Sequence, residues 1–200
     1  MKKSNIVLII LASVIGFFVF LFIVGFIYYR SNYNRMVTMK EDVTKQWSNV
    51  ENVYQRRLDL IPNLVNTVKG YANFEKETLT QVIEARAKAT SVNINAQNLD
   101  QASFQKFQQA QGNLTSALSR LMVVVEKYPD LKANQSFLEL QAQLEGTENR
   151  IAVERGRYNE NVNGYNVFVK QFPRNVIFRF AEMPYFKADE AAAKAPKVEF

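Results

Sequence analysis

Four glutamates at helical spacing are the first residues in this 200-residue chain that could do chemistry: Glu139, Glu145, Glu148 and Glu154. In helical bundles, inward carboxylates can hold two metal ions, but that site also needs Glu-x-x-His pairs. The chain has no His and no Cys, so zinc sites built on them and Ser-His or Cys-His nucleophiles are excluded as well. We therefore predict a solvated glutamate face, with no catalytic residue, cofactor or metal.

A second candidate is the stretch RRLDLIPNLVNTVKG, residues 56–70, where Arg56, Arg57 and Asp59 precede Pro62 and Asn63. These residues could form an anion or partner site. The competing interpretation is local charge satisfaction beside a proline, because proline inside a helix removes a backbone hydrogen bond.

The carbonyl left without its helical donor by Pro62 is that of Leu58. Arg56, Arg57 or water is expected to satisfy it. The apolar stripe through Val43, Trp47 and later positions keeps its register across the proline, which favours one kinked helix over two helices joined by a turn.

The N-terminal segment predicts a membrane anchor. Residues 6–27 form an uncharged stretch that is long enough to span a bilayer. Basic and tyrosine residues flank this stretch, as is typical of the membrane interface. No small-residue cleavage site follows, so an uncleaved single-pass anchor is favoured over a signal peptide. The basic residues on the two sides nearly balance, so the side of the membrane that holds the rest of the chain stays open.

The remaining sequence predicts an all-α, elongated up-down bundle of about four helices, since apolar residues recur at helical spacing. We expect helices over about 33–71, 73–89 with an Asn73 cap, 100–128 with an Asp100 cap, and 134–172. In the second helix Leu79, Val82, Ile83 and Ala87 are expected to face inward. The predicted organisation is an anchor over 1–30, a bundle over 31–172 and an extended tail over 173–200.

Two segments could carry interactions. Residues 154–168, ERGRYNENVNGYNVF, predict either a helix surface with inward tyrosines or an Asn/Tyr interface between bundle copies. In an up-down bundle of four helices, the last helix runs back toward the membrane. The aromatic tail is therefore expected at the headgroup layer, over the open end of the bundle, or on a neighbouring subunit. The candidate interaction residues in this tail are Phe178, Phe180, Tyr185, Phe186, Val198 and Phe200.

The net charge of +6 does not indicate nucleic-acid binding, because half of it comes from the basic residues that flank the anchor. The expected partners are the lipid bilayer and other copies of the chain.

The chain resembles the LemA family of bacterial membrane proteins. The stretches that carry the resemblance are residues 33–89, residues 157–175 with RYNENVNGYNVFVKQFPRN, and the final PYFKADEAAAKAPKVEF. The resemblance implies a single N-terminal anchor, an elongated helical bundle and no known catalytic residues. It also implies an anchor in the bacterial cytoplasmic (inner) membrane, a bundle on the cytoplasmic side, and an association with membrane proteases of the HtpX type.

Two functions of different classes follow. The first is a non-enzymatic, membrane-anchored scaffold or adaptor that organises itself or a partner at the membrane surface. The alternative is an accessory subunit or regulator of a membrane protease, with the tail or its final KVEF as the docking peptide.

Overall fold

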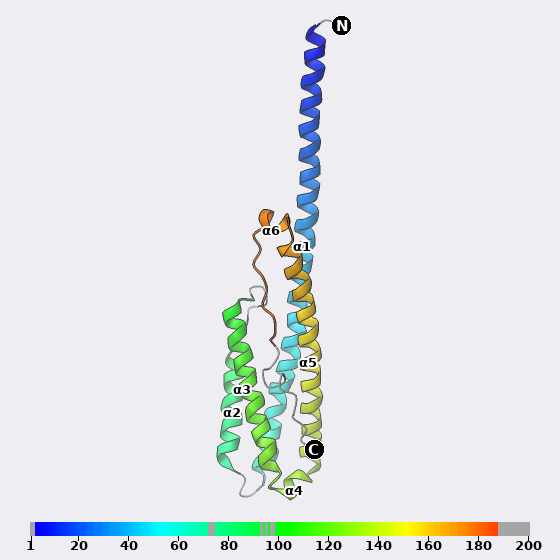
Figure 1. Ribbon diagram of the computed structural model, residues 1–200. Helices are drawn as coiled ribbons and strands as arrows, with labels where there is room; N and C mark the ends of the chain where they lie inside the picture. Colours follow the sequence, from blue (N-terminus) through cyan, green and yellow to red (C-terminus); the bar gives the residue numbers. More distant parts are fainter. Residues whose placement is uncertain (1–2, 72–74, 93, 95, 97–98, 188–200) are drawn as a thin grey trace, which may run out of the picture.

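A computed structural model describes residues 3–71, 75–92, 94, 96 and 99–187, and every regular element in these ranges is a helix. Figure 1 shows an elongated molecule in which one very long helix extends well beyond a bundle of the others. The predicted all-α class is confirmed.

The longest helix, α1 (Lys3–Lys69), joins the apolar N-terminal segment to the bundle without a break. From Leu8 to Ile27 its large apolar side chains are exposed, and this stretch is long and apolar enough to cross a membrane. The bundle half of the helix instead buries one stripe that includes Val43, Trp47 and Ile61, as the spacing predicts. One helix therefore has two parts, the first with the length and composition of a membrane-spanning segment and the second with one face in a protein core.

Pro62 lies inside α1 and does not end it, as the unbroken stripe predicts. The freed carbonyl of Leu58 accepts a hydrogen bond from Arg86 Nε on α2 (Lys76–Ser91) at 2.9 Å. The expectation that Arg56, Arg57 or water fills this role was therefore wrong. A neighbouring helix is the better donor because both arginines beside the proline point elsewhere, Arg56 outward and Arg57 into the core.

The other helices begin and end close to the predicted positions. Helix α3 (Gln101–Val125) starts at the Asp100 cap, whose carboxylate accepts from the N–H groups of Ala102 and Ser103. After the short α4 (Pro129–Lys132), Asn134 caps α5 (Gln135–Lys170) in the same way. Short polar side chains at these positions satisfy N–H groups that have no partner within the helix.

Helix α2 departs from the expectation. It begins at Lys76 with Glu75 at the cap position, while the predicted cap Asn73 lies outside the described residues. Its buried row is Thr78, Leu79, Val82, Ala85 and Ala89. The predicted inward positions Ile83 and Ala87 are exposed, because small alanines allow α2 to pack closely on its other face.

The helices pack mainly as two pairs, α1 with α5 and α2 with α3. Figure 1 shows the α2–α3 pair beside only the part of the long pair that lies farthest from the apolar N-terminal segment. The end of the bundle nearer that segment is called proximal below, and the opposite end distal.

The core falls into two clusters. The proximal core consists of Met36, Val43, Trp47, Val50, Tyr54, Ile94, Leu99, Phe104, Phe107, Ile151, Tyr158, Val162, Tyr165, Phe168, Val169, Phe178, Met183 and Phe186. The distal core consists of Leu58, Ile61, Leu64, Val65, Val68, Leu79, Val82, Ala85, Ala89, Ala110, Leu114, Ala117, Leu118, Leu121, Val125, Leu131, Phe137 and Leu144. The first is rich in aromatic side chains and the second is almost entirely aliphatic.

After α5 the chain forms the short α6 (Arg174–Ile177) and then reverses. Residues 178–187, called the return segment below, run back along α5 away from the apolar N-terminal segment (Figure 1). The prediction of helix to Phe172 followed by a tail is thus replaced by a helix to Lys170, a one-turn helix and an extended segment.

Candidate functional site

Two asparagines on α5 hold the return segment by its main chain. Asn166 accepts from the N–H of Met183 and donates to the carbonyl of the same residue, both at 2.9 Å. Asn159 does the same for Phe186, at 2.8 and 2.9 Å. Each side-chain amide therefore satisfies both polar groups of one residue, which an extended segment outside a sheet would otherwise leave without partners.

Two tyrosines next to these asparagines add a bond each. Tyr165 donates its hydroxyl to the carbonyl of Ala181 at 3.3 Å, and Tyr158 donates to the carbonyl of Pro184 at 3.1 Å. Burial raises the pKa of both hydroxyls above its ordinary value. Both tyrosines therefore remain neutral donors throughout the physiological pH range.

The spacing of these contacts follows from helix and strand geometry. The pairs Tyr158–Asn159 and Tyr165–Asn166 lie seven residues apart on α5, a rise of about 10.5 Å. Their partners lie three residues apart on the return segment, and three extended residues also span about 10 Å. One heptad of helix therefore matches three residues of extended chain, so the two sets of contacts stay in register.

Aromatic side chains fix the end of the return segment. The ring of Phe186 stacks on Trp47 at 6.0 Å and packs against Phe104 at 4.7 Å. Arg155 lies over its other side at 4.9 Å and donates to the carbonyl of Lys187 at 2.8 Å. We call these α5 contacts and this aromatic pocket together the tail channel.

A polar layer lies between the proximal and distal cores. Arg57 on α1 is 1% exposed and donates to the Thr115 hydroxyl at 3.1 Å, to the Gln111 side-chain oxygen and to the Glu148 carboxylate at 2.5 Å. Its guanidinium also lies 5.1 Å from the ring of Tyr54. One buried charge thus connects α1, α3 and α5.

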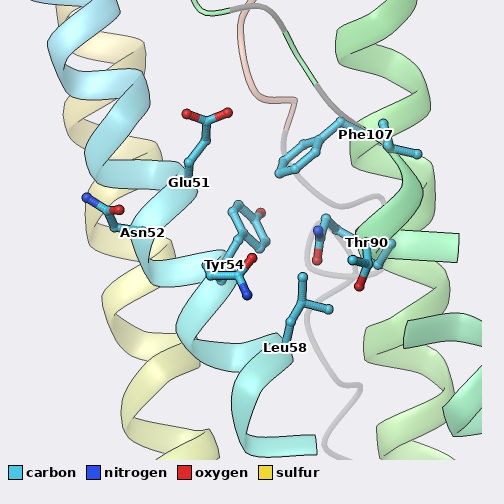
Figure 2. Close-up of a pocket in the computed structure, with 10 residues that line it drawn as sticks. Glu51, Asn52, Tyr54, Leu58, Thr90 and Phe107 are labelled. Atoms are coloured by element: carbon cyan, nitrogen blue, oxygen red, sulfur yellow. The ribbon is translucent and has the colours of Figure 1, made fainter. Parts of the chain in front are cut away.

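This layer forms the floor of an open groove of about 930 Å³ between α3 and α5, with Phe186 and Lys187 at one end. A smaller pocket of about 340 Å³ lies between α1, α3 and the end of α2. Figure 2 shows Tyr54 and Phe107 next to each other in its lining, and their rings pack edge to face with centres 5.0 Å apart. The smaller pocket contains no pair of groups arranged for acid–base or nucleophilic chemistry.

Glu51 lines the smaller pocket one helical turn after Trp47. Burial raises the pKa of Glu51, and the Trp47 indole opposes this shift in part. The indole N–H is buried and makes no hydrogen bond of normal geometry within the described residues. It therefore stabilises the carboxylate only weakly.

Comparison with known proteins gives the family, with a match to the LemA family over residues 46–200. The chain belongs to the LemA family. Two magnetosome proteins of Paramagnetospirillum magneticum, MamQ 1 and MamQ 2, are each 29% identical to it over 179 residues, which cover 80% of this chain and 66% of theirs. Protein LemA of Metamycoplasma hominis is 24% identical over 165 residues, 80% of this chain and 72% of its own. This LemA-family chain thus spans about two thirds of the length of the MamQ relatives.

The whole tail channel lies within the LemA match. The tail channel consists of Trp47, Phe104 and the residues of α5 and the return segment described above. All of these residues follow residue 46. The apolar N-terminal segment precedes the match. Together with its long apolar helix, membership of this family identifies the chain as a membrane-associated helical protein.

The predicted interaction residues of this LemA-family chain do not form one surface. Arg56, Asp59 and Asn63 are exposed and Pro62 is half-buried, whereas Arg57 is buried in the polar layer. Asp59 accepts a hydrogen bond from Gln55 at 2.7 Å. The stretch thus divides into an outer polar face and an inner one that contains Arg57.

The tail residues divide in the same way. Phe178 and Phe186 are buried in the proximal core, so among the three positions expected for the tail these two side chains take one on the bundle itself. Asn159 fixes the backbone of Phe186, whereas the ring of Phe178 packs against those of Tyr29 and Tyr33 on α1. Phe180 is half-buried and Tyr185 is exposed, while Val198 and Phe200 lie outside the described residues.

Glu148 and the asparagines are the positions that the sequence interpretation missed. Glu148 was expected on a solvated face, and its side chain is indeed 42% exposed, but its pairing with buried Arg57 was not foreseen. Asn159 and Asn166 were assigned to a helix surface or an interface between copies, and within the chain they bind its own tail. The signal that could have identified them is the Tyr-Asn dipeptide repeated at seven residues.

Proposed function

We propose that this protein is a non-enzymatic, membrane-anchored scaffold that organises copies of itself, or a partner polypeptide, at the membrane surface. The observation that carries the proposal is the tail channel, in which Asn159 and Asn166 each bind both backbone groups of one residue in an extended segment. Such contacts hold a polypeptide chain and provide no group for a reaction.

The continuity of α1 supports the anchoring part of the proposal. About 40 helical residues separate the end of the apolar segment from Lys69, a length of about 60 Å. An uninterrupted helix keeps the bundle at a defined height, which a flexible linker would not. The names of the relatives describe a family and a magnetosome rather than a reaction, which agrees with a structural role.

The tail channel can act between molecules because its main contacts do not depend on the identity of the bound side chains. A return segment from a second copy offers the same backbone groups and the same phenylalanine for the aromatic pocket. Exchange of identical segments is a low-cost route to assembly, since every contact made between copies already exists within one. We propose this exchange as the way in which copies are connected.

The exchange can be trapped with cysteines, because the native chain has none. Asn163 on α5 and Tyr185 on the return segment are both exposed, with their side-chain oxygens 3.5 Å apart. Two full-length variants, Asn163→Cys and Tyr185→Cys, would carry different affinity tags, be produced together in membranes and be treated with a short bis-maleimide.

Tail exchange predicts a crosslinked product that carries both tags. The double variant Asn163→Cys/Tyr185→Cys should also give a crosslink within one chain, which confirms the geometry. Val123→Cys with Tyr185→Cys serves as the control, since Val123 is 68% exposed at the far end of α3. Crosslinks only within single chains would contradict exchange between copies.

The protease alternative makes a different prediction. A regulator that docks by its tail should co-purify a membrane protease from native membranes, and removing residues after Lys187 should abolish that capture. The cysteine experiment and this one therefore separate the two functions.

A further inference from the structure

Three large apolar side chains are exposed together at the proximal end of the bundle. Phe172 is 82% exposed, Val176 67% and Ile177 47%, and they lie in the turn after α5 and in α6. We call these three residues the α6 patch. Neighbouring Phe178 is buried in the proximal core, so the chain buries one aromatic ring here and leaves three apolar side chains outside.

The α6 patch lies beside the point where α1 leaves its apolar stretch. The ring of Phe178 is 5.0 Å from that of Tyr29 and 6.4 Å from that of Tyr33. Arg174 on α6 donates to the side-chain oxygen of Asn32 at 3.5 Å. Figure 1 shows α6 next to α1 at the end of the bundle that faces the apolar segment. Tyrosines directly after a membrane segment are typical of the headgroup layer.

The charges around the patch suit that layer. Arg179 is exposed directly after Phe178, and Arg30 is exposed on α1. Arg174 lies over the ring of Phe168 at 3.8 Å and bonds to Gln171, so its charge stays at the rim of the bundle. Exposed apolar side chains mixed with basic ones are the composition of surfaces that enter the headgroup–acyl boundary.

We propose that the α6 patch is a second membrane contact, in which Phe172, Val176 and Ile177 enter the headgroup–acyl boundary beside the exit of α1. The inference rests on the membrane anchoring of α1 and is independent of exchange through the tail channel. With one contact the bundle could rotate and tilt about α1. With two contacts, a defined face of the bundle, including the open groove, is held in a fixed direction relative to the bilayer.

The test uses full-length protein reconstituted in nanodiscs that contain anionic lipid. A single cysteine at Val176 would carry an environment-sensitive dye, and nitroxide groups would be placed on the lipids at the headgroup or along the acyl chain. Val153→Cys is the matched control, because Val153 is a 51% exposed valine in the middle of α5. Phe22→Cys, in the apolar stretch, reports insertion of α1 itself.

The expected result is a blue-shifted emission at position 176 with several-fold stronger quenching by shallow nitroxides than at position 153. Position 22 should be quenched by deep nitroxides. Substituting Ile177→Glu in the Val176→Cys chain should reduce quenching at 176 and leave position 22 unchanged, whereas Val153→Glu should change neither.

Two results would overturn the proposal. If the dye at 176 is quenched no more than at 153 while position 22 is quenched, α1 is inserted and the patch does not touch lipid. If the dye at 176 is shielded from both lipid nitroxides and water-soluble quenchers, a second copy or another protein covers the patch. Failure of quenching at position 22 would contradict the anchoring, and the second contact with it, while leaving tail exchange to its own crosslinking test.

Discussion

The proximal and distal cores are filled by different kinds of side chain. The distal core packs helix against helix and is filled with leucine, valine and alanine. The proximal core lacks the α2–α3 pair along much of its length, and the extended return segment takes up that space with large aromatic rings. Helices satisfy their own backbone groups, whereas an extended segment must find donors and acceptors elsewhere. This is why Asn and Tyr occur on the proximal half of α5.

Arg57 marks the boundary between the two cores. Among the described residues α1 buries two polar side chains, Gln46 and Arg57, and Arg57 is the more deeply buried of the two. The partners of Arg57 come from α3 and α5. A buried charge with specific partners permits fewer alternative registers than another leucine would. The polar layer therefore fixes where the helical packing ends and the tail channel begins.

The largest effect is expected from Trp47→Ala, because Trp47 is 0% exposed and contacts four aromatic rings. Loss of a buried tryptophan costs about 3–5 kcal/mol of unfolding free energy. Leu114→Ala in the distal core is the counterpart. Urea unfolding measures the loss of stability in both variants. In Trp47→Ala the return segment should also loosen, which faster hydrogen exchange at the backbone N–H groups of Met183 and Phe186 would measure. Leu114→Ala should leave that exchange unchanged, and equal exchange in both variants would contradict the separation of the cores.

The polar layer should give the next largest effect. Glu148→Ala leaves the Arg57 guanidinium buried with only neutral partners, at a cost of about 3 kcal/mol. Arg57→Met removes the charge and keeps most of the volume, so its cost should be clearly smaller. Chemical denaturation of both variants measures the difference. A larger loss for Arg57→Met would mean that the ion pair itself stabilises the fold.

Substitutions in the tail channel should lower the free energy of unfolding less than Glu148→Ala does. Asn166→Ala leaves the N–H and carbonyl of Met183 without their partners, at about 2 kcal/mol. Asn149→Ala, at an exposed position on the same helix, is the control and should cost little. Limited proteolysis should cut the Asn166→Ala chain after α6 first. Unchanged proteolysis would show that side-chain packing alone holds the return segment.

The sequence predicts the α1, α3 and α5 parts of the distal core well, although it misplaces part of the inward face of α2. Apolar side chains at heptad spacing have one favourable arrangement, and the caps at Asp100 and Asn134 act locally. The boundaries of α3 and α5 are therefore close to those expected. The all-α class and the passage of α1 through Pro62 depend on the same local information.

The candidate site could not be predicted to the same degree. Asn159 and Asn166 bind residues 17 or more positions away, and no helical periodicity shows which extended segment they bind. Arg57 could be recognised as the polar position in an apolar stripe, but Glu148 could not be chosen from the other glutamates on α5. Long-range polar partners depend on the packing of the whole chain, which periodicity does not contain.

The smallest expected effect concerns how Pro62 connects α1 to α2. Arg86→Ala removes the donor to the Leu58 carbonyl, at about 1 kcal/mol because Arg86 is only half-buried. Pro62→Ala restores an N–H that can bond the same carbonyl, so this variant should keep or raise the melting temperature. In the Pro62→Ala background the helix no longer needs the arginine, and Arg86→Ala should then cost less than it does alone. A double-mutant cycle in full-length protein measures this coupling. Additive costs would show that Arg86 stabilises α2 by packing, and that the carbonyl freed by the proline is satisfied without it.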